Sequence, residues 1–264
     1  MDTANNNHVI EIIDVHKSFD SKHVHRGLNL SIKKGESITV LGGSGTGKSV
    51  LLKEITGLIR PDSGRLLIDG EDVVQMDETE LIRIRKKMGM LFQGSALFDS
   101  LTVAGNIAYP LLEHTDYTQQ RINEVVAMNL ELVGLSGIED IMPSELSGGM
   151  KKRVGLARAI AMNPEILLYD EPTTGLDPPN ISRINKLIQD MQQKFGVTGV
   201  IITHDVKCAF VVSDRIAFLH DGQIIFVGTV EEAQNSDIEV LNDFIHAKLR
   251  DENNLLPRNP YPPI

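Results

Sequence analysis

One segment constrains this chain more than any other: Gly42–Ser49 has the sequence GGSGTGKS, with the spacing G-x-x-x-x-G-K-S. It follows the apolar, strand-like run Ser37–Leu41 and precedes the helix-like stretch Val50–Ile55. In this setting backbone amides can turn inward around an anion, and the helix N-terminus adds positive potential. Lys48 can then reach the β- and γ-phosphates, and the Ser49 hydroxyl can bind Mg²⁺. A chance glycine-rich turn is the alternative, but the strand–loop–helix order favours a nucleoside triphosphate site.

Length and composition favour one large α/β domain, or one domain with a subdomain, over two full domains. The chain has 264 residues, of which 41% are hydrophobic. No stretch approaches the ~20 apolar residues of a membrane-spanning helix, and the start MDTANNNHVIEI is unlike a secretion signal. The single cysteine, Cys208, excludes an internal disulfide and fits a reducing compartment. We expect it to pack in the interior rather than to act in catalysis.

The charge of the chain argues against nucleic acid as a main partner. The formal net charge is −10, whereas affinity for nucleic acid comes largely from neutralising phosphates with basic residues. Two basic clusters do occur, at Arg83–Lys87 and Lys151–Arg153. We interpret both as solvated helix faces.

The order of expected elements indicates the fold class. Val9–Val15, Leu28–Ile32 and Leu66–Ile68 are typical of strands, so residues up to about 92 combine antiparallel strands with the nucleotide strand. From about 95 to 163 the apolar positions have helical spacing, notably over Gln119–Val133 and Gly148–Met162, which predicts a helical subdomain.

The second half returns to alternating strands and helices. Ile166–Tyr169 and Gly199–Thr203 are continuous apolar strands separated by a helix over Ile181–Phe195, which indicates a parallel sheet covered on both faces. Asp221 and Gly222 then mark a hairpin turn. We expect a single domain over residues 9–246. We expect residues 247–264 to form an extended or disordered tail. Four of the chain's 11 prolines lie from Asp251 onward, and for that reason we do not expect this part to be helical.

Two carboxylates end the strand ILLYDE. Side chains alternate along a strand, so Asp170 and Glu171 cannot point the same way. A division of roles follows: Asp170 would hold Mg²⁺, often through water, and Glu171 would face the attacking water as a general base or orienting group. Carboxylates at a strand end are ordinarily solvated, but their combination with Lys48 and Ser49 favours a functional site.

A second anion site is suggested by Leu146–Met150, LSGGM, which we call the signature segment. Ser147 is a good helix N-cap, and Gly148 and Gly149 leave bare backbone amides at a positive helix end. Taken alone, this segment is equally typical of a flexible helix cap.

Together these motifs resemble the ATP-binding-cassette ATPases in content and order: GGSGTGKS, Gln93 after the strand Met88–Phe92, LSGGM, ILLYDE, Gly175–Asp177, and His204 in IITHD. The resemblance covers about Val9 to Thr229. It implies an α/β fold of the P-loop NTPase class, with a RecA-like parallel-sheet core, an antiparallel β subdomain and a helical subdomain at about 95–163.

The resemblance also implies site residues, with ATP and Mg²⁺ as ligands. Gln93 would lie near the metal and attacking water, His204 would contact the γ-phosphate, and Phe19 would stack on adenine in place of the commoner tyrosine. For Phe19 alone, a core aromatic would be the default interpretation. The implied catalytic residues are Lys48, Gln93, Glu171 and His204, and the implied metal ligands are Ser49, Gln93 and Asp170. The implied nucleotide-binding residues are Phe19, Gly42, Gly43, Ser44, Gly45, Thr46, Gly47, Lys48, Ser49, Val50, Gln93, Ser147, Gly148, Gly149, Asp170, Asp177 and His204.

In this family Ser147 and Gly149 would cap the γ-phosphate of ATP bound by the opposite subunit. The chain carries one copy of each element, so the resemblance implies a homodimer, or a pair with a similar ATPase, that buries two nucleotides. ATP would then hold the dimer closed, and hydrolysis would release it.

Two further features resemble the ATPase subunits of Mla/Mce-type phospholipid transport systems: Phe92–His114 and the methionine at Met150, where most cassettes have glutamine. The expected partners are an integral membrane permease, with Leu97, Phe98 and Leu101 as candidate contacts, and Mce-type lipid-binding and accessory subunits. The expected location is the cytoplasmic face of the inner membrane, as an indirectly attached peripheral protein.

Three alternatives remain open at this point. The cargo could instead be an amino acid, a metal or a lipoprotein. A translation, chromosome or repair ATPase is disfavoured by the acidic charge and by the single uninterrupted cassette. A scaffold that hydrolyses little ATP is disfavoured by Glu171 and His204.

Overall fold

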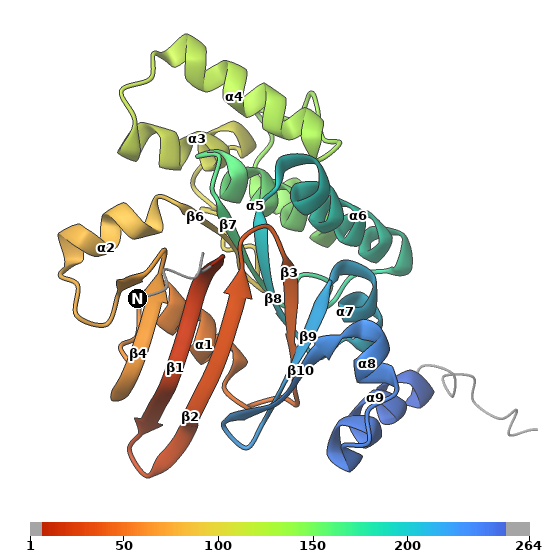
Figure 1. Cartoon of the computed structure of the whole chain (residues 1–264). Coiled ribbons are helices and arrows are strands. Elements are labelled where there is room, and N and C mark those ends of the chain that lie inside the picture. Colours follow the sequence, from red (N-terminus) through yellow and green to blue (C-terminus); the bar gives the residue numbers. More distant parts are fainter. Residues whose placement is uncertain (1–6, 252–264) are drawn as a thin grey trace, which may run out of the picture.

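The computed structural model describes residues 7–251, which form two sheets with helices packed around them (Figure 1). The first sheet is antiparallel, in the order β2-β1-β4-β5. Its strands are β1 (His8–Phe19), β2 (Lys22–Lys33), β4 (Ser63–Ile68) and β5 (Glu71–Asp72). It meets the second sheet where the amide of Arg26 in β2 donates to the carbonyl of Gly222, at 2.9 Å.

The second sheet has the order β10-β9-β3-β8-β7-β6 and is parallel except for β10, which pairs antiparallel with β9. Its strands are β3 (Ser37–Leu41), β6 (Met88–Leu91), β7 (Ile166–Asp170), β8 (Thr198–Thr203), β9 (Arg215–His220) and β10 (Gln223–Thr229). This arrangement confirms the expected parallel core, and the hairpin turn at Asp221 and Gly222 joins β9 to β10.

Both faces of the parallel sheet are buried, as the continuous apolar strands predicted. In β7, Ile166 and Leu168 pack with the core beneath the antiparallel sheet, and Leu167 and Tyr169 pack with the core beneath the helices. Alternation of side chains along a strand explains this division. The sheet is therefore a rigid middle layer between two hydrophobic cores.

Helices cover both faces of this layer (Figure 1). Helix α1 shares the core of the antiparallel sheet, whereas α3–α7 contribute to the other core. Between residues 95 and 163 the regular elements are α3, α4, a short 3₁₀ turn at Pro143–Glu145, and α5. The helices are α1 (Lys48–Ile55), α2 (Glu78–Arg85), α3 (Val103–His114), α4 (Gln119–Leu132), α5 (Gly148–Ile160), α6 (Pro178–Phe195), α7 (Val206–Val212), α8 (Val230–Gln234) and α9 (Glu239–Asp251).

The expected start of the extended tail at residue 247 is wrong, because helix α9 continues through residues 247–251. Leu241 and Ile245 of α9 are buried against β9, and Leu249 packs against the same cluster. The first proline of the tail is Pro257, so no proline interrupts the helix before Asp251. The rest of the tail, residues 252–264, lies outside the described residues.

Within residues 7–251, no helix has the length and apolar character needed to cross a membrane.

Candidate nucleotide site

Four parallel strands bring the expected site segments to one edge of the sheet. β3, β8, β7 and β6 are neighbours in that order, so their carboxyl ends lie together. The phosphate loop (residues 42–50) follows β3, His204 follows β8, Glu171 follows β7, and Gln93 lies in an exposed turn after β6. This is the edge where open α/β sheets bind ligands.

The phosphate loop ends in the first turn of α1. Gly47 occupies the N-cap with φ 106°, a backbone conformation that favours glycine, and no side chain within residues 7–251 caps the helix. The first amides of α1 are therefore available to an anion. The Lys48 ammonium lies over the loop and donates to the carbonyls of Gly42 and Gly43, both at 2.8 Å.

Lys48 is buried within the site, with only 7% of the residue exposed. Burial lowers the pKa of its ammonium, while the carboxylates of Glu171 and Asp170 oppose that effect. The expected lysine and the two expected carboxylates are thus close enough to interact electrostatically.

Asp170 and Glu171 have different partners, as the alternation along the strand predicted. The Ser49 hydroxyl donates to Asp170 Oδ1 at 3.4 Å, which joins the phosphate loop to the end of β7. Burial and the neighbouring Glu171 raise the pKa of Asp170, with the Ser49 hydrogen bond acting in the opposite direction. A cation placed beside Asp170 would relieve this unfavourable negative charge.

Glu171 is held by three side chains. Its carboxylate accepts hydrogen bonds from Thr174 and Thr203, both at 2.9 Å, and lies 2.8 Å from Nδ1 of His204. Burial by itself would raise the pKa of Glu171, but the hydrogen bonds from His204, Thr174 and Thr203 hold it below its ordinary value. The carboxylate is therefore kept ionised and is a ready hydrogen-bond acceptor.

Ser49 and Asp170 fit a magnesium ion, because Mg²⁺ prefers hydroxyl and carboxylate oxygens. In the described part of the chain, no cluster of three or more histidine, cysteine, aspartate or glutamate side chains could hold a metal alone. A magnesium ion at Ser49 and Asp170 would thus need further oxygens from phosphates or water, as is usual for this metal.

The signature segment begins helix α5. The Ser147 hydroxyl accepts the Met150 amide at 3.3 Å, which confirms Ser147 as the N-cap. Gly148 and Gly149 form the first turn of the helix, and Asp177 occupies the N-cap of the neighbouring helix α6. The signature segment therefore presents a helix N-terminus on a different element from the phosphate loop.

The interpretation of Lys151–Arg153 as a solvated helix face is wrong for two of its residues. Lys152 is 4% exposed, and its ammonium donates to the backbone carbonyl of Glu171 at 3.0 Å. Arg153 is also buried and donates to the carbonyls of Val133 and Gly134. Both side chains point into the protein, where backbone carbonyls at the ends of other elements accept hydrogen bonds from the Lys152 ammonium and from one terminal nitrogen of Arg153.

Phe19 is not a core aromatic. It is the last residue of β1 and is 42% exposed, with the Lys17 ammonium 5.3 Å from its ring centroid. Near this end of the sheet, a hollow of about 510 Å³ lies between the β1–β2 turn and the phosphate loop, lined in part by Ser44, Gly45 and Thr46. An exposed aromatic ring suits the stacking role that the family resemblance implies.

Cys208 is fully buried in helix α7, as expected for a packing residue. Burial raises the pKa of its thiol to about 12, and its sulfur donates to the Asn185 side chain at 3.2 Å. A thiol with this pKa is not a nucleophile at neutral pH.

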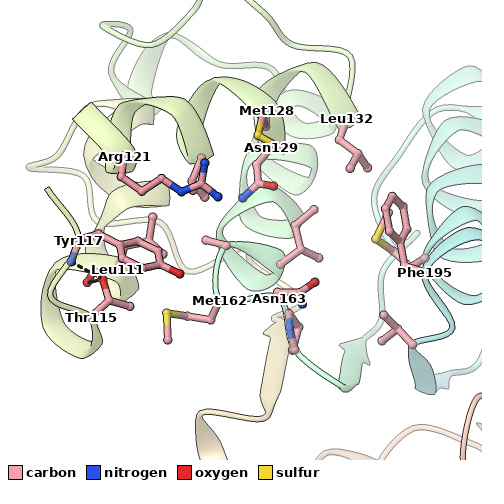
Figure 2. A pocket seen from close by; sticks show the side chains of 16 residues that line it. Leu111, Thr115, Tyr117, Arg121, Met128, Asn129, Leu132, Met162, Asn163 and Phe195 are labelled. Carbon is pink, nitrogen blue, oxygen red and sulfur yellow. Dashed lines mark hydrogen bonds between the residues drawn. The ribbon is translucent and has the colours of Figure 1, made fainter. Parts of the chain in front are cut away.

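Figure 2 shows the side chains that line a second hollow. It has a volume of about 400 Å³ and is lined by side chains of α3, α4 and α6, of the connection between α3 and α4, and of the segment after α5, including Tyr117, Arg121, Met128, Met162 and Phe195. None of the expected nucleotide-binding residues lines it. The nucleotide site is thus defined by the strand ends and the phosphate loop rather than by this hollow.

Sequence reasoning missed the residues that support Glu171. Thr174, Thr203 and Lys152 all contact it, yet none belongs to a motif position that had been singled out. Thr203 directly precedes His204, and Thr174 lies three residues after Glu171, so proximity in sequence was the available signal for those two. No sequence signal indicated that Lys152 points inward.

Comparisons with known proteins place this chain in one family. The family model described as "ABC transporter" matches residues 25–174. The intermembrane phospholipid transport system ATP-binding protein MlaF of Haemophilus influenzae is 39% identical over 237 residues, which is 89% of this chain and 90% of that protein. The probable ribonucleotide transport ATP-binding protein mkl of Mycobacterium leprae is 42% identical over 90% of this chain and 69% of that protein. The dimeric structure of MJ0796, a bacterial ABC transporter cassette, has a TM-score of 0.79 and 32% identity over 84% of this chain and 98% of that chain.

Proposed function

Since this chain belongs to the ABC transporter family as an ATP-hydrolysing, ATP-binding subunit, we propose that it energises phospholipid transport through a permease of the Mla/Mce type. The observation that supports phospholipid as the cargo is the match to the phospholipid transport relative, which extends over about nine-tenths of both chains. The match to the relative named for ribonucleotide transport leaves about a third of that protein uncovered. The features of Phe92–His114 and Met150 support the same choice.

The geometry supports hydrolysis by charge and position rather than by covalent catalysis. Glu171 is ionised and held at a strand end beside His204, so it can accept a hydrogen bond from the attacking water and orient it. His204 is 37% exposed at its side chain and can contact the terminal phosphate from the same edge. Gln93 reaches this edge from the turn after β6.

The phosphates of ATP are bound by the first amides of α1 and by the Lys48 ammonium. Ser49 and Asp170 would hold Mg²⁺, which supplies neutralisation of the charge that develops on the β- and γ-phosphates. Phe19 would stack on the adenine ring.

We further propose that the working unit is a pair of these chains. The signature segment begins α5 and the phosphate loop begins α1, so each chain carries one half of two different phosphate sites. In a two-fold dimer, Ser147 and Gly149 of one chain would cap ATP held by Lys48 of the other, with Asp177 at the same interface. The dimeric assembly of a solved cassette similar to this chain supports this arrangement.

The permease contact is proposed at the start of the helical subdomain. The rings of Phe98 and Tyr109 lie 4.8 Å apart at their centroids, and both residues are about two-fifths exposed. Leu112 is 58% exposed on the same helix as Tyr109. Such an exposed apolar surface fits a cytoplasmic segment of an integral membrane protein, which would hold the chain at the cytoplasmic face of the inner membrane.

Purification of the native membrane complex tests whether the transported molecule is a phospholipid. Under the proposal, the complex contains a permease, an Mce-type lipid-binding subunit and bound phospholipid detectable by mass spectrometry. Recovery of a permease with neither phospholipid nor an Mce-type subunit would contradict the lipid assignment while leaving the ATPase assignment intact.

A further inference from the structure

Lys152 connects two parts of the site that act on different ATP molecules in the proposed dimer. It lies on helix α5, which begins at the signature segment. Its ammonium donates at 3.0 Å to the backbone carbonyl of Glu171, and only 4% of the residue is exposed. A buried lysine is costly unless its charge serves a partner, and the ATP mechanism above gives Lys152 no role.

The backbone of Glu171 explains why such a contact is needed. Glu171 has φ 46°, in the left-handed region that residues with a side chain rarely adopt. Its amide donates to the carbonyl of Ile202 at 2.9 Å, and its carbonyl accepts hydrogen bonds from the Lys152 ammonium at 3.0 Å and, at the longer distance of 3.4 Å, from the Thr174 amide. Both backbone polar groups of Glu171 are therefore fixed, and the orientation of the peptide directs the carboxylate toward Thr203 and His204.

The surrounding charges also suit this role. Burial lowers the pKa of Lys152, and the carboxylates of Asp170 and Glu171 counteract that effect. The next residue along the helix, Arg153, donates to the carbonyls of Val133 and Gly134 after helix α4. Arg153 thus fastens helix α5 to the segment after α4, and Lys152 fastens it to the strand end that carries Glu171.

We propose that Lys152 is a positioning residue that holds Glu171 of its own chain, from the same helix whose N-terminus caps the partner's ATP. This inference rests on the proposed two-chain site. It makes α5 a direct link between the two ATP sites of the dimer, because one helix contacts one nucleotide and orients the glutamate that acts on the other.

The test uses mixed dimers with one competent site. A Ser147→Arg chain lacks a working signature segment, and a Lys48→Ala chain lacks a working phosphate loop. Purified by two different tags, their mixed dimer has one intact site, which takes Lys48 and Glu171 from the first chain and Ser147 from the second.

Lys152→Met is then placed in either chain. In the chain that supplies Glu171, we expect kcat to fall by roughly ten- to a hundredfold with little change in KM for ATP, as expected when a catalytic group is misplaced. In the chain that supplies Ser147, we expect kcat within about twofold of the parent mixed dimer. Lys152→Arg, which keeps a cationic donor, should restore activity above that of Lys152→Met, and Lys151→Gln serves as the control on the same helix.

Equal losses in both chains would show that Lys152 merely stabilises α5 and would overturn the proposal. Unchanged kcat with Lys152→Met in the Glu171 chain would also overturn it, provided that both mixed dimers have matching thermal unfolding and ATP affinity. An inactive parent mixed dimer would count against the two-chain site instead. The Lys152→Met and Lys152→Arg homodimers would then decide the positioning role, since only Lys152→Met should lose kcat.

Discussion

At the scale of single residues, the environment of Glu171 determines how the site works. A buried carboxylate would ordinarily take up a proton more readily, yet three donors hold this one in its charged form. Each donor comes from a segment next to the strand ends, so the acid strength of Glu171 is a property of the local fold. Removing a donor must raise the pKa of this carboxyl.

Thr174→Val removes one donor without changing the size of the side chain much. Because Glu171 must be ionised to accept a hydrogen bond from water, a raised pKa moves the acidic limb of the kcat profile to higher pH. Thr173→Val is the matched control, since Thr173 is buried next to Thr174 but donates to Asp205. A profile for Thr174→Val that superimposes on that of the control would contradict this role of the hydroxyl.

Lys48→Ala should abolish ATP binding or productive turnover while the fold remains intact. Among the described residues, the Lys48 side chain donates hydrogen bonds to Gly42 and Gly43 of its own loop, so its loss breaks no hydrogen bond between elements. Calorimetric titration with ATP measures binding, and circular dichroism follows the unfolding transition. Near-normal turnover would refute the assignment of the phosphate loop.

The motifs proposed for catalysis could be identified from sequence because the chemistry proposed for them depends on adjacent residues. GGSGTGKS and ILLYDE each carry their own local geometry, and the structure places Lys48, Ser49, Asp170 and Glu171 within reach of one another. Lys152 was not predictable in this way. Whether a lysine on a helix faces water or a distant carbonyl depends on packing between elements, which local sequence does not encode.

At the scale of elements, helix α5 is positioned by close packing on strand β6. Gly89 in the middle of β6 lies against the backbone of Ala159, and a Cβ at Gly89 would come within 2.1 Å of the Ala159 carbonyl oxygen. This close approach sets the distance between the strand before Gln93 and the helix that begins at the signature segment. Backbone atoms on the facing helix leave little room for adjustment.

Gly89→Ala should therefore destabilise the protein by about 3 kcal/mol, the upper range for an overpacked core. Gly94→Ala is the control, because a Cβ at Gly94 would meet no atom of the described residues within 4 Å. Urea denaturation of both variants measures the difference in the free energy of unfolding. Equal midpoints for the two variants would show that α5 does not rest on β6 as described.

The types of the main elements were easier to predict than their limits. Strand β7 was evident from its apolar run because both its faces are buried. The predicted end of α9 is wrong because its last turn depends on packing of Leu249 against a cluster whose buried members come mainly from α7, β9 and α9 itself. Such a tertiary contact extends a helix beyond the point where local composition would end it.

At the scale of the whole molecule, one chain holds both a phosphate loop and a signature segment. The phosphate loop lies at the start of helix α1, and the signature segment lies at the start of helix α5. The parallel sheet orders the catalytic strand ends, and the helical subdomain carries the start of α5. Two chains related by a two-fold axis would complete two sites at once. ATP would then favour the closed pair, and its hydrolysis would release the pair and move an attached permease.

The shared two-chain site is tested most directly by the mass of the Glu171→Gln chain in solution with and without ATP. This variant should hydrolyse ATP at least about a hundredfold more slowly and should therefore accumulate with nucleotide bound. Light scattering should show a doubling of mass on addition of ATP and Mg²⁺, and no doubling when Ser147→Arg is combined with Glu171→Gln. A chain that binds ATP yet keeps the mass of a single copy would contradict the shared site.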